Sequence, residues 1–159
     1  MESPVDEGMA GIELKNDWKH RKFPYYKESI QRIQSRGITV NGCFIIGLDG
    51  HTQRIFEDVY NFVREVELYE VQVTYHTPFP GTPLYERLLS QGRILEPGNW
   101  RKCTLFDINY QPAKMGVEEM RKGFHELVIQ LYGKEFTDWR RKLFWDRYKA
   151  QWKEVSPRS

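Results

Sequence analysis

Two short stretches of the chain carry the apolar pattern of buried β-strands. Residues 38–46 (ITVNGCFII) and 71–76 (VQVTYH) are rich in β-branched and aromatic side chains, which favour extended backbone. Apolar residues at helical spacing before, between and after them predict helices at 25–37, 55–66 and 83–91. The order helix, strand, helix, strand with short connections indicates a βαβ unit with parallel strands.

The second half of the chain has a different pattern. Residues 93–116 hold two prolines, two glycines and one strand-like piece, TLFDINY at 104–110. This composition predicts an irregular segment that crosses the surface. A helix should open after Gly116, and a last helix is expected over 134–155 (KEFTDWRRKLFWDRYKAQWKEV).

The small number of strands indicates the fold class. A parallel pair with crossover helices is too small to be stable alone, so more strands should lie beside it. The sequence therefore indicates an α/β fold over residues 1–95 that is the second half of a barrel or sheet whose first half is absent. Residues 96–159 are expected to form a mostly helical C-terminal extension.

The second strand alternates between an apolar and a polar face. Gln72, Thr74 and His76 share the polar face, and buried polar groups without partners would each cost about 1–3 kcal/mol. They either line a wet cavity inside a barrel or face water from an antiparallel edge strand. The first strand favours the cavity, because its Asn41 and Cys43 face is also only partly apolar. The candidate substrate cavity is Asn41, Gln72, Thr74 and His76.

Ligands in parallel α/β folds bind in the loops that follow the strands. These loops are residues 47–52 (GLDGHT) and 77–82 (TPFPGT). Prolines at 78, 80 and 83 fix three φ angles and restrict the residues before them. Such a stretch presents stiff backbone groups to a flat ligand and lowers the entropic cost of ordering a binding loop.

Composition and charge narrow the class of protein. The 159 residues are 40% hydrophobic and 29% charged, with a net charge of +2, as is typical of soluble globular proteins that do not bind nucleic acid through a global field. No apolar run approaches the roughly 20 residues of a membrane span, and the N-terminus lacks a signal-peptide pattern. We expect a cytoplasmic protein.

The C-terminal region is basic and aromatic. Aromatic residues at 139, 144, 148 and 152 interleave with basic residues at 140, 141, 147 and 149. This pattern suits a nucleic acid or an anionic surface. It also suits a helix that packs its aromatic stripe against the rest of the protein, which is the commoner case.

Only two cysteines occur, Cys43 and Cys103, and they are far apart in the chain. There is no CxxC, no CxxxCxxC and no cluster of cysteine and histidine at metal-ligand spacing. The chain itself is therefore expected to hold no metal.

Several stretches together resemble radical S-adenosylmethionine (radical SAM) enzymes, especially the subgroup with a cobalamin-binding domain. FIIGLDGHTQRIFEDVYNFV and TYHTPFPGTPLYERLLSQGRI look like later barrel strands of that family, and the initial MES is similar to the end of an earlier one. LFDINYQPAKMGVEEMRKGFHELVIQLY resembles the trailing segment of the subgroup.

The resemblance implies a cofactor site but assigns no catalytic residue. Ile45 would lie against the adenine, with Gly47 giving clearance. Backbone groups of the loop after the second strand would meet the adenine edge, and an early Glu-Ser pair would lie near the ribose or methionine. The implied cofactor-binding residues are Glu2, Ser3, Ile45, Gly47, Thr77, Pro78 and Phe79.

Two positions depart from the Gly-x-Ile-x-Gly-x-x-Glu pattern of the family, and a third departs directly after it. Cys43 stands at its first glycine and Gly50 at its glutamate, while His51 stands where many relatives carry an acidic residue.

The resemblance also implies cofactors that the chain cannot hold alone. In the parent enzyme a [4Fe–4S] cluster, held by a CxxxCxxC loop, reductively cleaves S-adenosylmethionine to a 5′-deoxyadenosyl radical, and cobalamin is possible. Residues 1–95 would be the C-terminal half of the partial (β/α) barrel of that family. This chain would supply the adenine-side wall and part of the cavity for a small-molecule substrate. We expect it to be a truncated gene product, an incomplete reading frame or an excised portion, inactive without the missing N-terminal half of the barrel.

A second hypothesis is a non-catalytic interaction module. It would keep the half-barrel and use the basic aromatic C-terminal helix to bind a partner.

Overall fold

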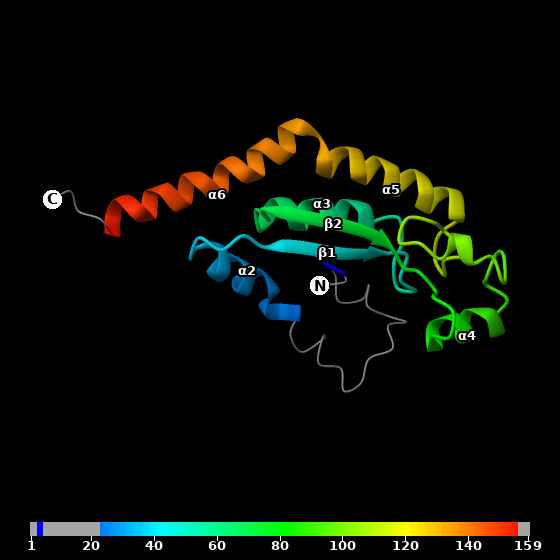
Figure 1. Ribbon diagram of the computed structural model, residues 1–159. Helices are drawn as coiled ribbons and strands as arrows, with labels where there is room; N and C mark the ends of the chain where they lie inside the picture. Colours follow the sequence, from blue (N-terminus) through cyan, green and yellow to red (C-terminus); the bar gives the residue numbers. More distant parts are fainter. Residues whose placement is uncertain (1–2, 5–22, 156–159) are drawn as a thin grey trace.

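The computed structural model describes residues 3–4 and 23–155 (Figure 1). The elements are a 3-10 turn η2 (Phe23–Tyr25), α2 (Tyr26–Gln34), β1 (Asn41–Ile46), α3 (Ile55–Glu65), β2 (Glu70–Tyr75), α4 (Pro83–Ser90), a 3-10 turn η3 (Trp100–Lys102), α5 (Val117–Tyr132) and α6 (Lys134–Val155).

The two strands form a parallel sheet, as the βαβ pattern predicts. Cys43 lies opposite Gln72, and Ile45 lies opposite Thr74. β1 begins at Asn41, three residues later than expected, because residues 38–40 enter the sheet without regular pairing. The prediction of an α/β fold is confirmed at this level, and the described residues contain one sheet of two strands.

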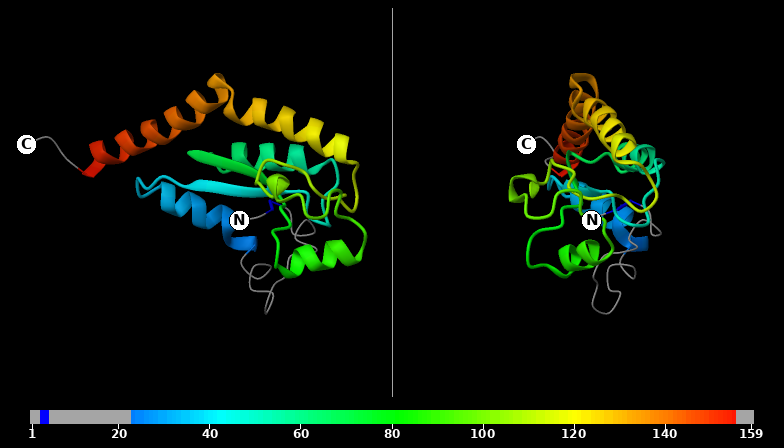
Figure 2. Two further views of the ribbon diagram at one scale, coloured as in Figure 1. Left: turned by 45° about the vertical axis from the view of Figure 1, so that its right-hand side comes forward. Right: turned by 90° about the vertical axis from the view of Figure 1, so that its right-hand side faces the viewer.

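One face of the sheet is covered by helices. Figures 1 and 2 place α5 above the strands together with α3, while α4 lies on the other side near the arrowheads. Phe44 and Val73 are almost fully buried on the covered face. The Tyr75 ring lies 4.1 Å from the ring of Phe124 on α5. Helix α5 therefore shares one hydrophobic core with the strands, and the division of the chain at residue 95 stays a prediction.

The strand-like piece at 104–110 is not a strand, so that prediction was wrong. The Thr104 hydroxyl donates to the Asp107 carboxylate at 2.6 Å and accepts the Phe106 N–H at 3.1 Å. A threonine side chain that bonds its own turn competes with a ladder in this way. Only the end of the segment pairs, through an antiparallel bridge between Ile94 and Tyr110.

Helix α6 is anchored by Arg140, one of the basic residues that interleave with its aromatic stripe. The Arg140 side chain is buried and donates from Nη1 to the carbonyls of Leu68 and Tyr69 at 3.2 and 2.9 Å, and from Nη2 to Leu131 at 3.1 Å. Phe144 is also buried, with its ring 4.9 Å from Tyr69. The first half of the aromatic stripe thus packs against the body.

No helix in the described part of the chain combines the length and the apolar character that a bilayer span requires.

Candidate functional site at the carboxyl ends of the strands

The turn after β1 is fixed by contacts from the second half of the chain. Gly47 has φ +97°, and a Cβ there would lie 2.1 Å from the Tyr110 hydroxyl oxygen. The Tyr110 O–H donates to the Gly47 carbonyl at 2.6 Å. Glycine is therefore needed here for its backbone angle and for the buried tyrosine, whatever else the position does.

A buried histidine joins this turn to Ser3. The Gly47 N–H donates to His51 Nδ1 at 3.2 Å, and His51 Nε2 lies 3.2 Å from Ser3 Oγ. His51 is 2% exposed and Ser3 is fully buried. The sequence assigned His51 no role, because its partner Ser3 is 48 residues away and nothing in the local spacing points to it.

A second histidine, His76, ends the polar face of β2. Its ring lies 6.0 Å from the Tyr110 ring, and its backbone N–H still donates to the Ile46 carbonyl at 2.8 Å. Burial lowers the pKa of His76 to about 4, with Asp49 opposing the shift and Arg87 adding to it. Burial and the nearby His76 also lower the pKa of His51 to about 4. Both rings are neutral at pH 7.

An ion-pair group ties α4 to the same turn. Asp49 accepts hydrogen bonds from Arg87 and Arg93, each at 2.7 Å. Burial opposes ionisation of Asp49, but the hydrogen bonds and charges of the two arginines together lower its pKa. This carboxylate is therefore the joint between α4 and the first loop.

The predicted substrate-cavity side chains share one side of the sheet. Asn41, Cys43 and Gln72 are exposed there, while Ile45 and Thr74 are half-buried. The Cys43 thiol lies 3.7 Å from the Gln72 side-chain oxygen, to which it can donate. The strand register thus assembles the polar face as the alternation predicts.

The loop after β2 is less open than its prolines suggest. Thr77 and Pro78 are buried, and only Phe79 is exposed. The Phe79 carbonyl accepts from both the Thr82 N–H, at 3.2 Å, and the Thr82 hydroxyl, at 2.6 Å. The expectation that the loop backbone is free for a ligand is therefore wrong at Phe79, because Thr82 forms the turn that caps α4. Glu2 lies outside the described residues.

Comparison with known proteins agrees with the motifs. Residues 82–159 match a family model described as a domain of unknown function, DUF4070. The chain is 26% identical over 107 residues to a bacteriochlorophyllide d C-12(1)-methyltransferase of Chlorobaculum tepidum, which is 67% of this chain and 23% of that protein. It is 29% identical over 98 residues to an anaerobic magnesium-protoporphyrin IX monomethyl ester cyclase of Cereibacter sphaeroides, which is 62% and 16%.

A third relative matches over a shorter stretch of the chain. The chain is 33% identical over 82 residues to a tRNA-2-methylthio-N(6)-dimethylallyladenosine synthase of Rickettsia akari, covering 50% of this chain and 18% of that protein. These matches confirm the resemblance to radical SAM enzymes. The matched stretch is less than a quarter of each of these relatives.

Of the two cofactors of radical SAM enzymes, the iron–sulfur cluster and S-adenosylmethionine, the described residues suit only the second. The cluster does not fit, because the described residues contain no group of three cysteine, histidine, aspartate or glutamate side chains that could hold a metal. S-adenosylmethionine fits better. The half-buried Ile45 gives the polar face an apolar spot for a flat ring, next to the hydroxyl of its register partner Thr74.

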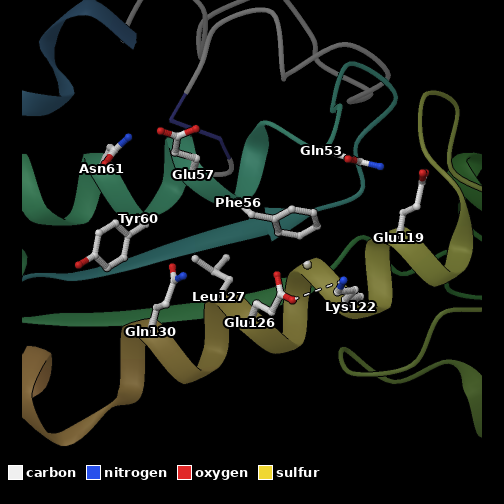
Figure 3. Close-up of a pocket in the computed structure, with 11 residues that line it drawn as sticks. Gln53, Phe56, Glu57, Tyr60, Asn61, Glu119, Lys122, Glu126, Leu127 and Gln130 are labelled. Atoms are coloured by element: carbon white, nitrogen blue, oxygen red, sulfur yellow. Dashed lines mark ion pairs between the residues drawn. The ribbon is translucent and has the colours of Figure 1, made fainter.

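A groove of about 740 Å³ lies elsewhere, between α3 and α5. In Figure 3 Phe56 of α3 and Leu127 of α5 form its apolar floor, and Glu57, Glu119 and Glu126 stand around it. None of the predicted site residues lines it.

Proposed function

We propose that this chain supplies the adenine-side wall and part of the substrate cavity of a radical SAM enzyme. The observation that carries the proposal is that Ser3 is buried against the turn after β1. His51 joins Ser3 to Gly47, and Gly47 directly follows the strand that holds Ile45. Ser3, Gly47 and Ile45 were assigned to one cofactor from separate motifs, and the fold brings their segments to one end of the sheet.

The reaction would be the reductive cleavage of S-adenosylmethionine to a 5′-deoxyadenosyl radical in the parent enzyme. Ile45 would contact the adenine face, and the Thr77 and Pro78 backbone would lie at its edge. Asn41, Gln72, Thr74 and His76 would face the small-molecule substrate. Iron ligands would come from another part of the parent. One of the relatives is named a methyltransferase, which supports keeping cobalamin in the proposal.

The missing partner would be the N-terminal half of the barrel, paired along β1. Val40 and Ile46 point their carbonyls at β2, so Asn41, Cys43 and Ile45 point their backbone groups to the outer edge. No backbone bond from the part of the chain that the structure describes reaches that edge. A parallel strand fits there.

The outer edge of β2 is already occupied. The Tyr75 N–H donates to the Leu105 carbonyl at 2.8 Å, and the Tyr132 hydroxyl donates to the Val71 carbonyl at 3.0 Å. This contrast supports a sheet that continues beyond β1 and ends at β2.

The interaction-module hypothesis has less support. Two of its basic aromatic residues, Arg140 and Phe144, are buried. Other basic side chains of α6 are engaged in ion pairs, namely Arg141 with Glu70, Lys142 with Asp146 and Arg147 with Glu67.

A test is to titrate the ¹⁵N-labelled chain with S-adenosylhomocysteine and follow its backbone amides. We expect shifts at the amides of residues 45–47 and of Thr77, and their loss in Ile45→Glu but not in Ile129→Glu, an exposed isoleucine on α5. Shifts confined to the α3 and α5 groove, or no shifts at millimolar ligand in a folded chain, would contradict the proposal.

A further inference from the structure

We propose that His51, as the neutral tautomer protonated on Nε2, is a positioning residue that holds Ser3 at the ligand-facing turn after β1. The inference rests on the proposed function, because it assigns the residue that sets one side of the same cofactor site. It concerns a position where the sequence departs from the family pattern.

The hydrogen bonds specify the tautomer. A backbone N–H can only donate, so His51 Nδ1, 3.2 Å from the Gly47 nitrogen, must be the unprotonated acceptor. The proton of the neutral ring is then on Nε2, which lies 3.2 Å from Ser3 Oγ and donates to it. One ring thus connects two segments that are far apart in the sequence.

The turn itself is held on both sides. His51 takes the Gly47 N–H, while Tyr110 donates to the Gly47 carbonyl at 2.6 Å. Tyr110 also holds the turn from its carbonyl side, whereas the Nε2–H is the contact that joins Ser3 to His51. We therefore expect loss of His51 to displace Ser3 more than it displaces the turn.

The surroundings keep the ring neutral. His51 is 2% exposed, and His76 from the end of β2 is the titratable group that acts on it. Asp49, Arg87 and Arg93 act on His76 in turn. A proton on Nδ1 would remove the acceptor for the Gly47 N–H and place a charge in a buried site. Acid should therefore break the Gly47 contact first, because the protonated ring still donates from Nε2 to Ser3.

Two substitutions separate hydrogen bonding from packing. His51→Leu fills the space without polar groups. His51→Gln keeps an acceptor and a donor, since a carboxamide oxygen can take the Gly47 N–H while its nitrogen donates to Ser3. We expect His51→Leu to weaken S-adenosylhomocysteine binding about tenfold, the effect of losing one oriented hydrogen bond. His51→Gln should recover most of it.

A double-mutant cycle tests whether His51 acts through Ser3. Ser3→Ala should weaken binding as His51→Leu does, and the double variant should lose little more than either single one, because both remove the same contact. Additive losses, or a His51→Leu chain that is folded by circular dichroism and binds as the wild type does, would overturn the proposal.

The deciding measurement does not need a ligand. Long-range ¹H–¹⁵N correlation spectra of the histidine-labelled chain at pH 7 should show His51 protonated on Nε2 alone, and this signal should change in Ser3→Ala. A ring protonated on Nδ1 or on both nitrogens would overturn the proposal. If the tautomer is as expected but the wild type binds no S-adenosylhomocysteine, the proposed function fails while the contact stands.

Discussion

The two faces of the same two strands differ sharply. Phe44, Val73 and Tyr75 are buried beneath α3 and α5, and they form one core with both helices. Cys43 and Gln72, each one residue before a buried residue, are exposed, and so is Asn41. Strand alternation places these opposite environments within a few ångströms of each other.

The difference separates a face of the sheet that helices cover from a face that is open. The apolar face has its full helical cover, and the outer edge of β2 is bonded by Leu105 and Tyr132. The polar face carries the side chains that we propose to face a substrate, and the contacts at its carboxyl end join Ser3, His51 and Gly47. Stability and function should therefore be separable by face.

The largest effect should come from the covered face. Phe44 is 1% exposed and meets the Phe62 ring at 5.9 Å, so Phe44→Ala should lower the free energy of unfolding by about 3–5 kcal/mol. Gln72→Ala on the open face should change it by less than about 0.5 kcal/mol. Urea unfolding followed by circular dichroism measures both free energies. Equal losses in the two variants would contradict the difference between the faces.

The next effect is acid sensitivity at the carboxyl ends of the strands. Burial lowers the pKa of His51 and of His76 from 6.5 to about 4. Between these values the unfolded chain binds protons that the folded chain does not, so stability is complete above pH 6.5 and falls towards pH 4. Roughly 2–3 kcal/mol should be lost, mainly through the more deeply buried His51.

Substitution checks the source of this loss. His51→Gln should reduce the fall in unfolding free energy between pH 6.5 and pH 4, because the variant lacks the group that titrates. A pH profile that is unchanged in both His51→Gln and His76→Gln would refute the assignment.

A smaller effect is expected at the turn after β1. Gly47→Ala forces a side chain to φ +97° and against the Tyr110 hydroxyl, and should cost about 2 kcal/mol. Gly92→Ala, at φ +65° with open space around it, should cost about 1 kcal/mol from the backbone angle alone. Thermal unfolding compares the stability of the two variants. An equal loss of stability would mean that the Tyr110 side chain moves aside at little energetic cost.

The smallest effect concerns the two tyrosines that reach the sheet backbone. Tyr110→Phe leaves the buried Gly47 carbonyl without its donor and should cost about 1–2 kcal/mol. Tyr132→Phe removes a bond to Val71 at a half-exposed site and should cost about 0.5 kcal/mol, because water can replace the hydroxyl. Chemical unfolding measures both losses of stability. A larger loss in Tyr132→Phe than in Tyr110→Phe would contradict the argument from burial.

The sequence by itself determined the strands, their parallel pairing and the side chains that share each face. Period-two alternation at 71–76 separates Val73 from Thr74 whatever lies around them. Helix bounds were also close, because glycines and Pro83 mark them locally. The radical SAM motifs were readable for the same reason, since each is a short continuous run.

Only the tertiary structure decided which distant residues meet. His51 bonds Ser3 across 48 positions, Tyr110 bonds Gly47 across 63, and Arg140 bonds Leu68 across 72. Each of these side chains has an ordinary local context, so no spacing rule selects it. Their roles follow from burial, because a polar group removed from water must find its partner wherever the fold brings one.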